Sequence, residues 1–208
     1  MPTDASRLLG LASGGTIIVA LPLLTVLDRA WLLDQGWSPV THNRLQWPSL
    51  LLLGPHGWAV AAALLSSAAC GLAFAMTLRT RGCRRTGMWA GLMACNVALV
   101  SIPPVDDARG LKLVVIHNVA YVGVLATWAL AAQAAMTETQ LLPRARSIRL
   151  TSAIALTLVG LGAVLEWVPA IGQVARLLII FPMAAWTAGV SILMRDGTRE
   201  ADHARTRT

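Results

Sequence analysis

Six long apolar stretches, separated by short polar loops, constrain this chain of 208 residues more than any other feature of its sequence. A bilayer core is about 30 Å thick, so one spanning helix needs roughly 20 mostly apolar residues. Six such helices use well over half of the chain. We therefore expect an all-α protein, a six-transmembrane-helix bundle that forms a single domain over residues 1–208. The expected spans are 8–27, 58–78, 88–102, 113–136, 150–168 and 173–194.

The amino-acid composition is typical of a protein that is embedded in a membrane. Hydrophobic residues make up 56% of the chain and charged residues only 13%, which leaves too little polar surface for a soluble domain. The net charge of +7 comes mostly from arginines beside the ends of the expected helices. Such clusters set topology and meet anionic lipid, and no soluble nucleic-acid module is visible, so no nucleic-acid partner is expected.

Arginine placement predicts the orientation. Arg7, the two loops after the second and fourth spans, and the C-terminal tail hold twelve of the 17 Lys and Arg residues. Because cytoplasmic segments are enriched in Lys and Arg, both termini are predicted to be cytoplasmic. The first span lacks a cleavage site after a short apolar core, so it is expected to be retained in a bacterial cytoplasmic membrane. Three cysteines, an odd number, argue against a disulfide framework.

The loop between the first two spans contains an unusual apolar stretch at 45–53. Nine residues are too few to cross a bilayer. The stretch is therefore expected either to lie in the membrane interface or to re-enter the bundle.

Ionisable residues near the expected outer ends of the helices are the main candidates for a site, because such groups are costly within a membrane. They are Asp28, His56, Asp106, His117, Glu166 and Arg176. A closed bundle would bring them to one cavity. The alternative is that each is hydrated at the headgroup level and paired with a neighbouring arginine.

One face of the fourth span carries a second set of candidates. His117, Tyr121 and Trp128 are spaced by four and seven residues and so share one side of a helix. This stripe fits either a binding site or a structural polar seam between helices.

Tryptophan is strongly over-represented, with 8 Trp against 2 Phe and 1 Tyr. Trp31, Trp58 and Trp167 fall on the expected outer side, where an interfacial aromatic belt is the ordinary explanation. Indole faces are also the best side-chain partners for a cation. A pocket lined by these tryptophans, with a carboxylic acid beside them, would suit chemistry that passes through a carbocation.

Metal and serine chemistry are weaker alternatives. His42, His56, His117 and Asp106 could together hold a zinc ion, but no histidine pair has helical ligand spacing and no H-E-x-x-H is present. No metal and no other cofactor is predicted. A serine nucleophile has less support, because there is no G-x-S-x-G and Ser49 has no base beside it in the sequence.

Three short segments resemble a bacterial six-span membrane family known as domain of unknown function 998. They are 54–58 (Gly-Pro-His-Gly-Trp), Pro104-Val105-Asp106 followed by His117, and Gly172-Gln173 with Arg176 and Trp186. The chain departs from the family in its double proline and its Asp106-Asp107 pair. The resemblance implies no established reaction, but it implies that His56, Asp106, His117, Gln173 and Arg176 belong to one site. In kind, though not in motif, the chain is also similar to small membrane-embedded terpene cyclases.

The function expected from these features is an enzyme that acts on an apolar or prenylated substrate in the outer half of the bundle. Its sharpest form is a proton-initiated prenyl-chain cyclase, in which Glu166, Asp28 or Asp106 is the acid and His117 orients it. Glu166 is favoured because no basic residue lies within four positions of it. Substrate contacts are expected from Trp31, Trp58, Tyr121, Trp128, Trp167, His56 and Arg176. The alternatives are a non-catalytic lipid-binding, sensory or immunity-type protein and a metal-dependent lipid hydrolase.

Overall fold

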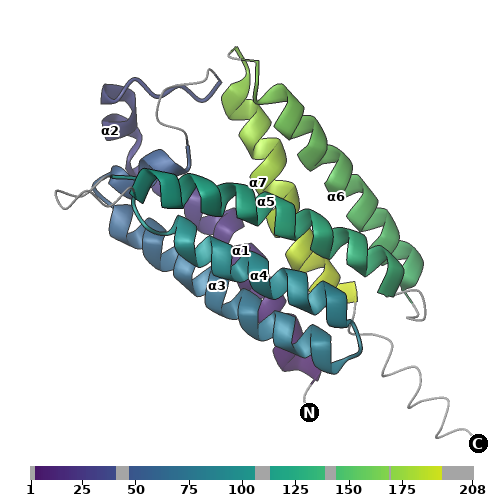
Figure 1. The fold of residues 1–208 in the computed structure, drawn as a ribbon. Helices are drawn as coiled ribbons and strands as arrows, with labels where there is room; N and C mark the ends of the chain where they lie inside the picture. Colours follow the sequence, from purple (N-terminus) through teal and green to yellow (C-terminus); the bar gives the residue numbers. More distant parts are fainter. Residues whose placement is uncertain (1–2, 41–46, 106–112, 139–143, 169, 194–208) are drawn as a thin grey trace, which may run out of the picture.

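The structure, a computed structural model, describes residues 3–40, 47–105, 113–138, 144–168 and 170–193. This part of the chain is helical and contains no strand (Figure 1). In chain order its elements are α1 (Thr3–Leu27), α2 (Arg29–Asp34), the 3-10 helix η1 (Ser49–Leu53), α3 (Gly57–Thr80), α4 (Arg84–Val100), α5 (Leu113–Glu138), α6 (Ala145–Leu165) and α7 (Gly172–Leu193).

Five of these helices are long and apolar enough to cross a membrane: α1, α3, α5, α6 and α7. Each has at least 21 residues in its apolar stretch, or about 30 Å of helix at 1.5 Å per residue. The α4 helix has 17 residues, which corresponds to about 25 Å. The all-α class and the multi-pass membrane character predicted from the sequence are therefore confirmed.

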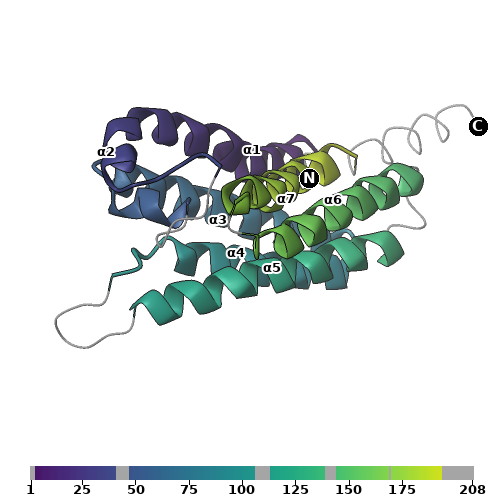
Figure 2. The same ribbon diagram turned by 90° about the horizontal axis from the view of Figure 1, so that it is seen from above.

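The long helices run antiparallel and form a ring in which each packs on two neighbours (Figures 1 and 2). Going round the ring, α1 is followed by α3, α4, α5, α6 and α7, and α7 packs on α1 again. The short helix α2 lies at one end of the bundle and the N terminus lies towards the other (Figure 1). We call the end with α2 and η1 the η1 end.

Small and large side chains are distributed in the way that lipid favours. Alanines fill the contacts between helices, as at Ala131, Ala132 and Ala135 of α5, which are fully buried. Large aliphatic side chains such as Val119 and Val122 point outward and are exposed. Lipid is as apolar as leucine, so helices gain little by hiding large apolar groups and pack instead through small ones.

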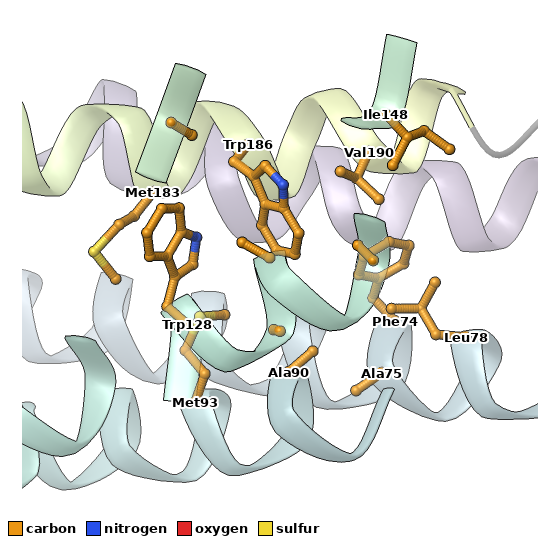
Figure 3. Packing of buried hydrophobic residues seen from close by; sticks show 14 of the residues in the cluster. Phe74, Ala75, Leu78, Ala90, Met93, Trp128, Ile148, Met183, Trp186 and Val190 are labelled. Atoms are coloured by element: carbon orange, nitrogen blue, oxygen red, sulfur yellow. The ribbon is translucent and has the colours of Figure 1, made fainter. Parts of the chain in front are cut away.

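Two tryptophans from α5 and α7, the two neighbours of α6 in the ring, meet in the core. Trp128 of α5 and Trp186 of α7 meet edge to face, with ring centroids 5.9 Å apart and planes inclined by 82° (Figure 3). This is a preferred arrangement for two aromatic rings. Met93 and Ala90 of α4 belong to the same cluster (Figure 3).

Two polar contacts fasten helices to each other away from the η1 end. The hydroxyl of Ser13 in α1 donates to the Ser67 carbonyl at 3.0 Å, and the Ser67 hydroxyl donates to the Ser13 carbonyl at 2.8 Å. At the opposite end of the ring, the Glu138 carboxylate accepts the backbone N–H groups of Arg85 and Thr86 at 2.8 Å. Glu138 therefore caps the free N–H groups at the start of α4 from the end of α5.

The apolar stretch in the first loop re-enters the bundle. Leu50, Leu51 and Leu52 of η1 are buried against residues of α1, α2 and α3 such as Leu21, Leu32 and Val60. Of the two predicted alternatives, the interface and the bundle, the structure supports the second for residues 47–53. Residues 45 and 46 of that stretch lie outside the described residues.

The expected span limits are close to the helix limits except at α1, which begins at Thr3 and not at residue 8, and at α6. The span at 150–168 was expected to contain Glu166, but α6 begins at Ala145 and ends at Leu165. The basic residues Arg146 and Arg149 therefore lie in the first turns of this helix, and Glu166 is its C-cap residue. Arginine stems can extend along a helix end while their charged groups reach water, so basic residues did not mark the helix start.

Close packing of α1 on α7 gives the first prediction. A Cβ atom at Gly14 would lie 2.2 Å from the carbonyl oxygen of Ala184, whereas a Cβ at neighbouring Gly15 would meet no described atom within 4 Å. Gly14→Ala should therefore destabilise the fold by about 1–3 kcal/mol, as overpacking does. Gly15→Ala should be neutral or slightly stabilising, since alanine favours a helix by about 1 kcal/mol over glycine. Thermal unfolding of both variants in detergent checks this, and equal midpoints would contradict the α1–α7 packing.

Candidate functional site

The candidate site is built around the segment of residues 47–56, which we call the η1 segment. It fills the end of the helix ring and carries η1 followed by Gly54, Pro55 and His56. Polar side chains from α1, α5 and α7 bond to it. Each of these bonds is formed by residues far apart in the sequence.

The first link joins the η1 segment to α5. The Ser49 hydroxyl lies 2.7 Å from Nε2 of His117, and Nδ1 of the same ring lies 3.0 Å from the carbonyl oxygen of Ile102. A carbonyl only accepts hydrogen bonds, so Nδ1 carries the proton and donates it. In the neutral ring Nε2 is then an acceptor, and the Ser49 hydroxyl donates to it. His117 lies in the second turn of α5 and is almost fully buried, as the sequence predicted.

The second link joins the η1 segment to the end of α1. Nδ1 of His56 lies 2.5 Å from Oδ1 of Asp28, and the His56 backbone N–H donates to Oδ2 at 3.3 Å. The Asp28 side chain is 1% exposed and that of His56 is 44% exposed. A Cβ atom at Gly54 would lie 2.7 Å from Oδ2 of Asp28, so the glycine allows this close approach. Asp28 thus pairs with a histidine across the bundle end.

The third link joins the η1 segment to α7. Arg176, whose side chain is 2% exposed, donates from Nη1 to the Trp47 carbonyl oxygen at 3.0 Å and from Nη2 to Oε1 of Glu166. A buried guanidinium needs such a counter-charge, because an unpaired buried charge is very costly. Glu166 was favoured as a neutral acid because it has no basic neighbour in the sequence. The fold supplies Arg176, and that argument for Glu166 no longer holds.

The Trp47 indole adds a fourth link. Its Nε1 donates to the hydroxyl of Thr25 in α1 at 2.8 Å, and the ring is buried. The η1 segment is therefore bonded to α1 and α7 at Trp47, to α5 at Ser49, and at His56 to Asp28, which directly follows α1.

A cavity of about 110 Å³ lies inside the bundle, next to the η1 segment. Residues of α1, α3, α4, α5 and α7 line it, and most of them are aliphatic, such as Leu64, Val97 and Ile180. Pro48 and Tyr121 also line it. Pro48 precedes Ser49, and Tyr121 lies one helical turn after His117, so the Ser49–His117 pair is adjacent to the cavity wall.

The predicted ionisable residues within the described ranges gather around the η1 segment and not around this cavity. None of Asp28, His56, His117, Glu166 and Arg176 lines the cavity. The prediction that they face one cavity is therefore wrong for these five. The physical reason is that residues of the η1 segment bond to Asp28, His117 and Arg176, and Arg176 in turn bonds to Glu166. Asp106 lies outside the described residues.

The aromatic candidates divide into three groups. Trp58 and Trp167 are 74% and 88% exposed, so they point away from the bundle interior and fit the interfacial belt. Trp128 is fully buried, but it packs in the core against Trp186 and not on the cavity. Trp31 packs beside the η1 segment, and only Tyr121 of these predicted contacts lines the cavity.

The described residues form no group of three His, Cys, Asp or Glu side chains that could hold a metal ion. His56 and His117 belong to separate pairs, since His56 contacts Asp28 and His117 contacts Ser49. His42, the other histidine considered for zinc, and Asp106 lie outside the described ranges. The described histidines therefore give no support to a metal-dependent hydrolase.

Sequence reasoning dismissed Ser49, because its base is 68 residues away in the chain. Its position in an apolar stretch of a polar loop was the available signal. Gln173, which the family resemblance had indicated, is buried at the start of α7, and its side-chain amide has no partner among the described residues.

No family model matches the sequence, and no match was found among curated proteins or solved structures. The resemblance to domain of unknown function 998 and to terpene cyclases therefore stays a prediction. The fold and the distribution of side chains define the class: an integral membrane protein with several transmembrane helices.

The Arg176–Glu166 pair gives the second prediction. Glu166→Gln leaves the buried guanidinium without its counter-charge, and breaking a buried pair costs up to about 3–5 kcal/mol, less where one partner is partly exposed. The double variant Glu166→Gln, Arg176→Met removes both charges and should recover part of that loss. Thermal unfolding of the two variants and the wild type forms the test. A single variant as stable as wild type would mean that the pair contributes nothing.

Proposed function

We propose that this protein binds the hydrocarbon chain of a membrane lipid or prenylated molecule in its central cavity, with the polar part of that molecule at the η1 end. The observation that carries the proposal is the cavity itself, to which five helices contribute and which is lined mostly by apolar side chains. Binding sites for such ligands are mostly apolar, with a few polar groups at one end that fix orientation. The polar links of the η1 segment supply those groups.

An enzyme and a non-catalytic lipid-binding protein would both use this cavity. The proton-initiated cyclase has less support, because the described residues that line the cavity include no carboxylic acid. Asp28 is paired with His56, and Glu166 with Arg176, so both described candidate acids already have a basic partner. Asp106 is the remaining candidate acid.

We further propose that α4 crosses the membrane with the other five helices, which gives six spans. It packs along both α3 and α5, each of which is long enough to span, and in Figure 1 it runs between them. Both termini then lie on one side. The arginine-rich loops share that side, which the positive-inside rule assigns to the cytoplasm of a bacterial cell.

This topology is the third prediction. In a variant without native cysteines, Arg84→Cys, at the exposed start of α4, should be protected from a membrane-impermeant maleimide in intact cells, whereas Val105→Cys, which is exposed after α4, should react. Permeabilised cells are the control, in which both should react. Reaction at Arg84→Cys with protection at Val105→Cys would reverse the orientation. Equal reaction at both sites in intact cells would remove the sixth span.

Chain binding is the fourth prediction, and α5 offers a matched pair of positions. Val124 lines the cavity, whereas Val122 is exposed on the outside of the same helix. Val124→Trp should fill the cavity and lower crosslinking by photoactivatable lipids that carry a diazirine in a prenyl or an acyl chain. Val122→Trp should crosslink like wild type. Equal crosslinking in the two variants, at peptides outside the cavity, would contradict the proposal.

A further inference from the structure

We propose that Ser49 and His117 form a nucleophile and general base that cleave an ester bond of a lipid whose acyl chain lies in the central cavity. The position of the acyl chain rests on the proposed function above. The reactivity of the Ser49–His117 pair does not, because it stands on the geometry of the pair alone.

The pair has the arrangement that activates a serine. A serine hydroxyl is a weak nucleophile until an adjacent base takes its proton, and the base must be held in the correct tautomer by a third group. Nε2 of His117 accepts a hydrogen bond from the Ser49 hydroxyl at 2.7 Å. Nδ1, on the other side of the ring, donates to the Ile102 carbonyl oxygen at 3.0 Å and so keeps its proton. The carbonyl thus fills the orienting position.

The burial of the two side chains also suits a base and its nucleophile. His117 is almost fully buried, which fixes the ring and keeps water from Nε2, while Ser49 is only partly buried. Pro48 and Tyr121 place the pair beside one end of the cavity wall. A chain held in the cavity would therefore present its carboxyl ester end near the Ser49 hydroxyl.

The reaction balances with water as the second substrate. Oγ of Ser49 attacks the ester carbonyl carbon and its proton passes to Nε2 of His117. The bond between that carbon and the alcohol oxygen breaks, the alcohol leaves with the proton from His117, and the acyl group stays on Ser49. Water then loses a proton to Nε2, attacks the acyl carbon and releases the fatty acid, and the proton returns to Oγ.

A purely structural link between η1 and α5 would show the same distances, so the test has to measure reactivity. The full chain in lipid nanodiscs is treated with two alkyl fluorophosphonates, one with a short and one with a long chain, and adducts are located by peptide mass spectrometry. A single adduct on Ser49 is expected. Ser49→Ala should abolish it, and Ser66→Ala is the control because Ser66 is an exposed serine of α3.

The base role is tested by His117→Gln, which should slow labelling of Ser49 by about 10²- to 10⁴-fold. A second variant, Ser49→Cys, keeps His117 and so tests the base role even if His117→Gln does not fold. Iodoacetamide should alkylate Ser49→Cys much faster than Ser66→Cys, although position 66 on α3 is the more exposed of the two. An unlabelled Ser49 in folded wild type, or equal alkylation of the two cysteine variants, would overturn the proposal.

The chain-length comparison separates the two proposals. If the cavity holds the chain, the long probe should label Ser49 faster than the short one, and Val124→Trp should remove that advantage while Val122→Trp keeps it. Labelling of Ser49 with no chain-length preference would support the Ser49–His117 pair and contradict chain binding. Crosslinking of lipid in the cavity with no labelling of Ser49 would do the reverse.

Discussion

The hydrogen bonds of the η1 segment are the constraint on which the rest of this structure depends. A segment inside a membrane protein that does not form an α-helix must have its polar groups satisfied by the protein, because lipid offers no hydrogen-bond partners. Here Asp28, His117 and Arg176, from three helices, bond to the segment at His56, Ser49 and the Trp47 carbonyl. The same bonds satisfy the buried side chains, so the segment and the helices fix each other's positions.

This arrangement separates two kinds of environment along the bundle. The η1 end holds paired charges and a Ser–His hydrogen bond, and the centre holds an apolar cavity. Elsewhere the helices pack closely through small residues, as where Gly14 of α1 faces the Ala184 carbonyl of α7. A lipid chain with a polar end would contact both environments at once, with its hydrocarbon part in the cavity and its polar part at the η1 end. The proposed binding and the proposed ester chemistry follow from that proximity.

Acidic side chains that pair with basic ones are less suited to donate a proton, so the pairs seen here favour a different chemistry from the one that the sequence suggested. Sequence distance favoured Glu166 as a neutral acid, but Arg176 lies across from it and is buried. Sequence distance also dismissed Ser49, whereas the ring of helices brings His117 to its hydroxyl. In both cases the partner comes from another helix. Spacing in the sequence predicts which residues are neighbours on one helix, but it does not predict which residues meet across a bundle.

The sequence by itself determined the helices, because each apolar stretch must be long enough for a bilayer and all backbone groups must bond within it. Helix limits at α3, α5 and α7 therefore followed to within a few residues, as did the burial of His117. Only the tertiary structure decided that the apolar loop enters the bundle and which polar residues pair. Those outcomes depend on how helices rotate and pack, and small residues such as Gly14 set that packing through contacts with atoms far away in the chain.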